Sequence, residues 1–107
     1  MSKRALIEAA ASALTQKLMD DGKLIEAGFA AFARAVIPND APAIQRSEMR
    51  IAFVAGAEHV FSSIMNVLEE GEDPTANDLR RLEMLQNEID ELRAELTERF
   101  NPTKGHA

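Results

Sequence analysis

Histidine is the side chain best suited to acid–base chemistry near neutral pH, and this chain has two. His59 follows Glu58 in an apolar stretch, whereas His106 lies in a polar segment, residues 101–107. A general acid or base needs a partner that holds it, and a metal ion needs three or four ligands. One internal histidine meets neither need, and no Glu-x-x-His pair of a helical di-metal site occurs. We therefore predict no catalytic residue and no metal ligand.

The segment EEGEDPTAND, residues 69–78, is the second group that could do chemistry, because carboxylates are calcium ligands. Its acidic residues are Glu69, Glu70, Glu72, Asp73 and Asp78. A calcium loop of the EF-hand type needs alternating ligands, a central Gly and a Glu at its twelfth position. This segment contains Pro74 and lacks that register, so we predict no calcium site. With no phosphate loop or nucleophile elbow either, we expect no cofactor and no enzyme.

Four phenylalanines leave a ligand pocket between helices as an alternative to an ordinary core. They are Phe29, Phe32, Phe53 and Phe61. Phenylalanine at helical spacing most often packs in a protein's own core. A ligand site would require a cavity lined by these rings, with His59 pointing inward.

Composition points to a folded chain with one modest core. Of its 107 residues 46% are hydrophobic, and the mean hydropathy is -0.21. We expect one domain over residues 1–100 and a flexible tail over 101–107. No cysteine is present, which excludes disulfides and thiolate metal sites. We recognise neither a signal sequence nor an apolar run of membrane-spanning length, so we expect a cytoplasmic protein without membrane contact.

The net charge of -6 is unevenly distributed. Residues 1–50 contain seven basic and six acidic residues, whereas residues 51–107 contain five and twelve, a balance of -7. Nucleic-acid binding depends on basic side chains that neutralise phosphates, so direct binding to DNA or RNA is disfavoured. The acidic half is either a solvated helix surface or a mimic of nucleic acid.

Apolar periodicity predicts an all-α chain, a compact bundle of about four helices over residues 3–19, 23–36, 44–69 and 76–100. The breaks between them are DDG, IPNDAP and GEDPT, which are rich in helix-ending residues. We expect Gly22 to end the first helix, and Thr75 with Asp78 to cap the last. The second helix has few polar residues and should be mostly covered by neighbours. The third helix has a broad apolar face. That face comprises Phe53, Ala57, Phe61, Ile64, Met65 and Leu68.

The fourth helix has an apolar seam with spacings of three, four, three and four residues, as in a coiled coil. We define the seam as Leu82, Leu85, Ile89, Leu92 and Leu96. In a parallel pair of such helices Glu88 would face Arg93 of the partner. In an antiparallel pair Arg81 could meet Glu95, but Glu88 would meet itself. The charges therefore leave the direction open, and the seam is short for an independent coiled coil.

Three surfaces could cover this seam. The helix could fold back on its own chain, pair with a second copy, or bind a different protein. The first two are compatible with each other. We predict interaction through the seam together with Glu88 and Arg93, with a homodimer and an unidentified protein as the partners.

The run GKLIEAGFAAFARAVIPNDAPAIQRSEMRIAFVAGAEHVFSSIM, residues 22–65, resembles short helical proteins encoded by phages and prophages of proteobacteria. Most members of that group have no assigned function, and no catalytic motif defines it. The resemblance covers under half of the chain. It implies a phage-related accessory role and transfers no site residues.

The leading hypothesis is thus a non-enzymatic helical interaction protein that associates with itself. The alternative is an acidic inhibitor that mimics nucleic acid and blocks a host DNA- or RNA-binding protein, such as a defence protein. A third class is a small-ligand-binding helical domain built on the phenylalanines.

Overall fold

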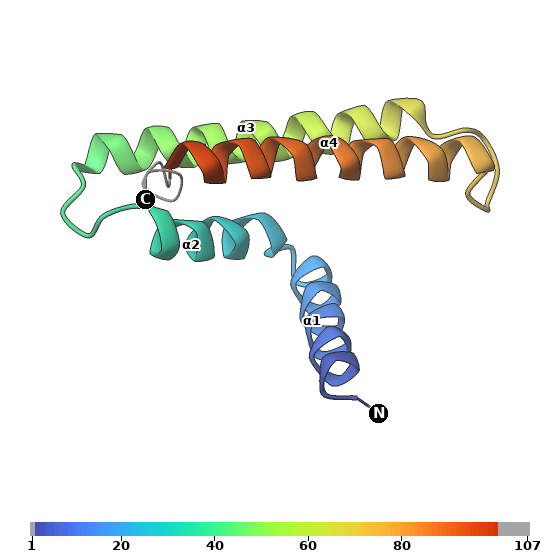
Figure 1. Cartoon of the computed structure of the whole chain (residues 1–107), viewed down its shortest axis with the longest axis horizontal. Coiled ribbons are helices and arrows are strands. Elements are labelled where there is room, and N and C mark those ends of the chain that lie inside the picture. Colours follow the sequence, from blue (N-terminus) through green and yellow to red (C-terminus); the bar gives the residue numbers. More distant parts are fainter. Residues whose placement is uncertain (1, 101–107) are drawn as a thin grey trace. The chain divides into compact units, whose positions relative to one another are not determined.

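The computed structural model describes the backbone of residues 2–100 and the side chains of residues 2–98. Four helices occupy this part of the chain, which contains no β-strand (Figure 1). They are α1 (Lys3–Asp20), α2 (Leu24–Val36), α3 (Ala43–Val67) and α4 (Ala76–Phe100). The prediction of an all-α chain with four helices is confirmed. The predicted tail at 101–107 lies outside the described residues.

The chain separates into two units, and the boundary falls within α3. The first unit extends to Val60 and contains α1, α2 and most of α3, while the second begins at Phe61 and contains the end of α3 and α4. The expectation of one domain over residues 1–100 stays a prediction.

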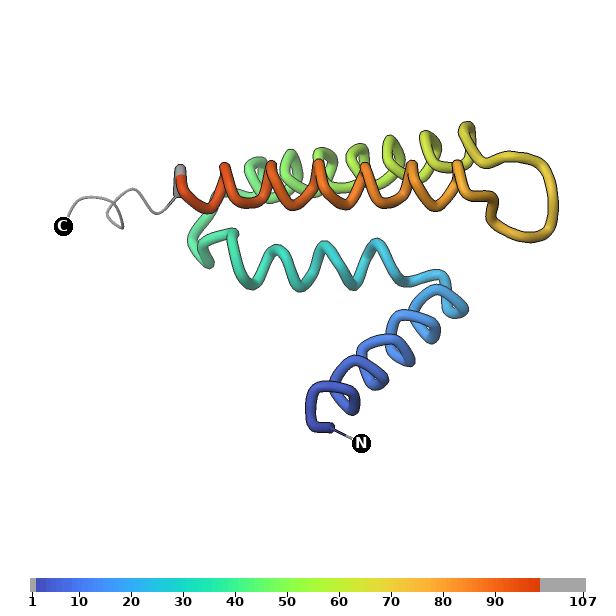
Figure 2. The backbone as a smooth tube through the Cα atoms, turned by 45° about the vertical axis from the view of Figure 1, so that its right-hand side comes forward, coloured from blue at the N-terminus to red at the C-terminus, as the bar shows by residue number. Residues whose placement is uncertain are grey.

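The start and end of α1 follow directly from local sequence. The hydroxyl of Ser2 accepts a hydrogen bond from the backbone N–H of Ala5 at 3.1 Å, which satisfies a free donor of the first turn. At the other end Gly22 has φ +70, which glycine adopts without strain. The N–H of Lys23 then bonds the carbonyl of Leu18 at 2.8 Å, completing a Schellman motif. Gly22 therefore ends α1 as predicted, and Figure 2 follows the backbone through the bend into α2.

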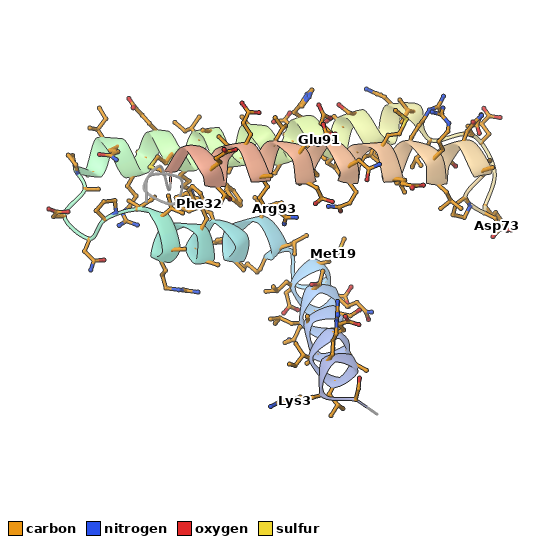
Figure 3. All side chains as sticks on the ribbon, viewed as in Figure 1. Lys3, Met19, Phe32, Asp73, Glu91 and Arg93 are labelled. Carbon is orange, nitrogen blue, oxygen red and sulfur yellow. The ribbon has the colours of Figure 1, made fainter. Side chains whose placement is uncertain are left out.

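No side chain of α1 is buried, and most of its apolar residues are exposed, among them Met19, which Figure 3 labels. The large apolar residues of α1 that are exposed are Leu6, Ile7, Leu14 and Met19. Leu18, close to the bend, is half-buried. The first unit therefore builds its core without α1.

The core of the first unit is the C-terminal part of α2 and the residue that follows it. Phe29, Ala33 and Ile37 are 8%, 7% and 4% exposed. Their spacing of four residues places them on one helical stripe. Phe53 of α3 joins them, because its ring contacts those of Phe29 and Phe32 at centroid distances of 5.6 Å. These rings lie in tilted and edge-to-face arrangements, which aromatic pairs prefer to direct stacking.

The broad apolar face predicted for α3 is only partly covered. Phe53, Ala57 and Ile64 are half-buried, but Phe61 is 66% exposed and Met65 and Leu68 are also exposed. The last three of these apolar side chains therefore have little cover within the chain. Periodicity shows which side chains share a face, but not how much of that face a neighbour reaches.

Candidate functional site

The apolar seam lies on α4, as its spacing predicted, and most of it is exposed. Leu82 and Ile89 are 41% and 43% exposed, and Leu92 and Leu96 are each 50% exposed. Leu85 is half-buried. Apolar side chains in a contiguous row on a helix are the surface that another helix covers in a coiled coil. Whether this row forms a coiled coil stays a prediction.

The carboxylate of Asp90 links two polar side chains of α4, Gln86 and Arg93, through hydrogen bonds. Asp90 accepts a hydrogen bond from the side-chain amide of Gln86 at 3.0 Å and from the guanidinium of Arg93 at 2.7 Å. Arg93 is therefore held along one edge of the helix. It lies on a different side of α4 from Glu91 (Figure 3). Both Glu88 and Arg93 remain accessible to solvent.

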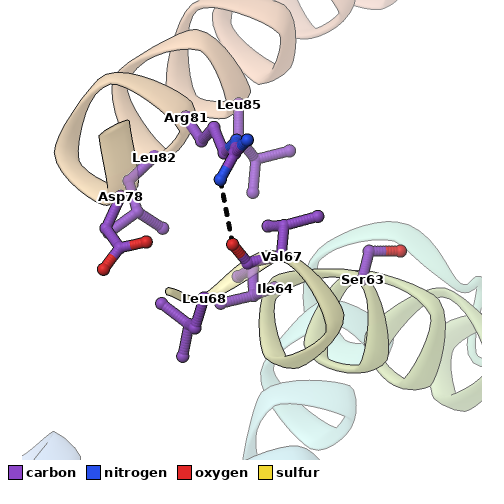
Figure 4. Close-up of a pocket in the computed structure, with 8 residues that line it drawn as sticks. All are labelled: Ser63, Ile64, Val67, Leu68, Asp78, Arg81, Leu82 and Leu85. Atoms are coloured by element: carbon purple, nitrogen blue, oxygen red, sulfur yellow. Dashed lines mark hydrogen bonds between the residues drawn. The ribbon is translucent and has the colours of Figure 1, made fainter. Parts of the chain in front are cut away.

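In the second unit the first seam residues meet the end of α3 around a small apolar pocket. Its volume is about 180 Å³, and Figure 4 shows the side chains that line it. They are Ser63, Ile64, Val67, Leu68, Asp78, Arg81, Leu82 and Leu85. The first part of the seam is thus used within the chain. Ile89, Leu92 and Leu96 take no part in this pocket.

Thr75 and Asp78 form a reciprocal cap at the start of α4. The hydroxyl of Thr75 accepts a hydrogen bond from the backbone N–H of Asp78 at 3.1 Å, and the carboxylate of Asp78 accepts one from the N–H of Thr75 at 3.1 Å. Two donors that the helix leaves free are satisfied in this way. The predicted cap is confirmed.

The same carboxylate also ties the end of α3 to α4. Asp78 is 4% exposed, and its second oxygen accepts a hydrogen bond from the N–H of Glu69 at 3.0 Å. Thr75 donates its hydroxyl proton to the carboxylate of Glu69. The backbone N–H groups of Glu69 and Thr75 favour the charged form of Asp78 and lower the pKa of this carboxyl below its ordinary value. The hydroxyl of Thr75 and the charge of Arg81 act in the same direction, against desolvation.

Helix α3 ends at Val67, two residues before the predicted end at residue 69. The carbonyl of Val67 accepts a hydrogen bond from the guanidinium of Arg81 at 3.0 Å (Figure 4). A carbonyl in the last turn of a helix has no hydrogen-bond donor within its own helix, and here Arg81 of α4 is the donor. The N–H of Glu69 is meanwhile bonded to Asp78. Side chains of α4 therefore fix this end, which the sequence of α3 does not specify.

Arg81 is the residue whose role sequence reasoning missed. The seam pattern predicts Arg81 as an ion-pairing group beside the seam, whereas in the structure its guanidinium donates a hydrogen bond to the main-chain carbonyl of Val67. The free carbonyls at the end of α3 were a signal that some donor was needed. The path of the loop between α3 and α4 decides which donor reaches these carbonyls. That path cannot be predicted from local sequence.

Three of the four phenylalanines considered for a ligand pocket belong to the core of the first unit. The rings of Phe29, Phe32 and Phe53 pack on each other, whereas Phe61 and His59 are exposed. The ligand-binding alternative stays a prediction. Among the described residues no group of three His, Asp or Glu side chains is placed to hold a metal ion. Within the same residues no helix is both long and apolar enough to cross a membrane.

Comparisons with protein-family models, with curated proteins and with solved structures gave no significant match to this chain.

Proposed function

We propose that this chain is a non-enzymatic, cytoplasmic helical interaction protein, related to phages or prophages, that forms a homodimer through the seam of α4. The single observation that carries the proposal is the exposure of Ile89, Leu92 and Leu96, at 43% to 50%, on one side of a regular helix. Apolar side chains of this size gain free energy when a second surface removes them from water. The sequence resemblance of residues 22–65 supports the phage relation.

The strength of self-association is bounded by the size of the seam. Removing apolar surface from water stabilises by roughly 25 cal/mol per Å², and a fully buried Leu or Ile contributes about 1.5–3 kcal/mol. Three half-exposed side chains from each copy therefore contribute on the order of several kcal/mol, part of which offsets the entropy lost on association. We expect a dimer that dissociates on dilution, so the measurement belongs at tens of micromolar.

The test compares a seam variant with a matched outer-face variant. Ile89→Asp with Leu92→Asp places charges in the seam, and Asn87→Asp with Ala94→Asp places two on the opposite face of α4. Size-exclusion chromatography with light scattering should give a dimer mass for the wild type and the outer-face variant, and a monomer mass for the seam variant. Circular dichroism verifies that all three remain helical. A monomer mass for the wild-type chain at tens of micromolar would contradict the proposed self-association.

A second partner, a different protein, is part of the proposal because exposed apolar side chains also occur outside the seam. In α1 they are Leu6, Ile7, Leu14 and Met19. Affinity capture from the native host with the wild type, and again with the seam variant, separates a partner that binds through the seam from one that binds elsewhere. A genomic position outside any phage or prophage would count against the phage relation.

The acidic surface of α4 favours one alternative, an inhibitor that imitates nucleic acid. Exposed carboxylates recur along the outer side of this helix at Glu83, Asp90, Glu91 and Glu98. Regularly spaced negative charges can satisfy a basic groove. This alternative predicts capture of a basic nucleic-acid-binding protein that added DNA or moderate salt displaces. Capture that is insensitive to both would contradict it.

A further inference from the structure

We infer that the seam pairs in parallel with the seam of a second copy, with Ile89, Leu92 and Leu96 of both chains in contact and Glu88 of each beside Arg93 of the other. This inference rests on the proposed self-association and adds the direction, the register and the specific side chains. The sequence alone left the direction open. The turn between α3 and α4 supplies the missing constraint.

The first heptad of the seam, Leu82 and Leu85, already has contacts within its own chain. Leu82 and Leu85 line the pocket that the end of α3 closes, and Arg81 donates its hydrogen bond to the carbonyl of Val67. That carbonyl belongs to the last turn of α3, so losing Arg81 would leave it without this donor. Pairing between copies is therefore easiest through the seam that begins at Ile89.

An antiparallel pair needs the first heptad or sets like charges against each other. In the register that brings Arg81 to Glu95 of the second copy, the first heptad takes part in the pairing, and Glu88 faces its own equivalent. In the register one heptad along, Ile89 packs against Leu92 of the second copy, and Glu88 then faces Glu95. Each antiparallel register thus contains a Glu–Glu contact.

A parallel pair places opposite charges together instead. Glu88 then lies beside Arg93 of the second copy, and two such contacts form by symmetry. Arg93 already donates to Asp90 at 2.7 Å, but a guanidinium has five N–H donors, and Asp90 keeps Gln86 as a second donor at 3.0 Å. Ile89 followed by Leu92 also places the β-branched residue at the seam position that favours two parallel strands.

A parallel pair also brings two acidic turns to the same end. The exposed acids concerned are Glu70, Glu72 and Asp73 of each copy. Ile89 lies thirteen residues into α4, which is about 20 Å along its axis at 1.5 Å per residue. Charges are screened over about 8 Å at physiological ionic strength, so repulsion between the turns has little effect at the paired segment.

Substituting Glu88 gives effects of opposite sign for the two directions. Glu88→Gln removes two Glu–Arg contacts from a parallel dimer, and we expect its dissociation constant to rise about two- to tenfold. In an antiparallel dimer it removes a Glu–Glu contact and lowers that constant. Glu91→Gln makes the same change of net charge on another side of α4 and should have little effect. Sedimentation equilibrium at tens of micromolar measures all three chains, and circular dichroism verifies that each is folded.

Cysteine cross-linking tests the direction independently, because the chain has no cysteine of its own. Leu96→Cys lies near its own equivalent only in a parallel pair, within the roughly 6 Å between Cα atoms that a disulfide requires. Under mild oxidation we expect a covalent dimer of Leu96→Cys and none of the outer-face control Ala94→Cys.

The two ways of failing are distinguishable. A dimer in which Leu96→Cys cross-links only to Leu85→Cys, and which Glu88→Gln strengthens, overturns the parallel pairing and leaves self-association standing. A wild-type chain that is monomeric overturns both.

Discussion

The backbone N–H of Thr75 and the carboxylate of Asp78 lie 3.1 Å apart, and the N–H of Asp78 and the hydroxyl of Thr75 are separated by the same distance. This reciprocal pair starts α4, and through the N–H of Glu69 it also holds the end of α3. The turn that positions the seam therefore depends on two short side chains.

Replacing Thr75 by Ala should destabilise the second unit by about 1 kcal/mol, as is usual for the loss of a helix cap. The substitution removes the acceptor for the N–H of Asp78 and the donor to Glu69. Urea unfolding followed by circular dichroism measures the change. Thr15→Ala is the control, because the hydroxyl of Thr15 bonds Ala11 within an exposed helix and caps nothing. Equal effects of the two substitutions would contradict the assigned role.

Asp78 should make stability depend on pH. Its pKa is lowered in the folded chain, first by the N–H of Glu69 and then by that of Thr75. A lowered pKa means that the charged carboxylate stabilises the fold fully above the unfolded-state pKa of about 3.9, and that this contribution is lost as pH falls through the lower folded value.

Asp78→Asn keeps the shape of the side chain but removes this titration. We expect the variant to be less stable than the wild type at pH 7, and the difference to shrink as the pH is lowered below 4. Asp73→Asn, in the same loop, serves as the control because Asp73 is exposed. Urea midpoints measured from pH 7 to pH 3 give the comparison. A difference that stays constant over this range would contradict the prediction.

Phe29 and Phe61 should respond differently to the same truncation. Phe29 is 8% exposed and contacts two other rings, whereas Phe61 is 66% exposed. Phe29→Ala removes core contacts and leaves a cavity, so we expect a loss of about 3 kcal/mol in the free energy of unfolding. Phe61→Ala should change it by less than about 1 kcal/mol. Thermal and urea unfolding of both variants tests whether the core is where the structure places it.

Local sequence was sufficient for the helices and several of their ends. Gly22, with φ +70, ends α1, and Thr75 with Asp78 starts α4, both as predicted. These features depend on residues within a few positions of one another, so they can be recognised without knowing the fold. The early end of α3 at Val67 could not be recognised in this way, because its hydrogen-bond donor, Arg81, is fourteen residues away.

The sequence by itself determined which side chains share a helical face, including the whole seam, because the period of the helix fixes that arrangement. Only the tertiary structure decided how much of each face is covered. Phe29 and Ala33 are buried while Ile25, on the same helix, is 43% exposed, and Leu85 is half-buried while Leu92 is 50% exposed. The physical reason is that burial depends on where a neighbouring element lies in space. A repeating pattern along one helix contains no information about that neighbour.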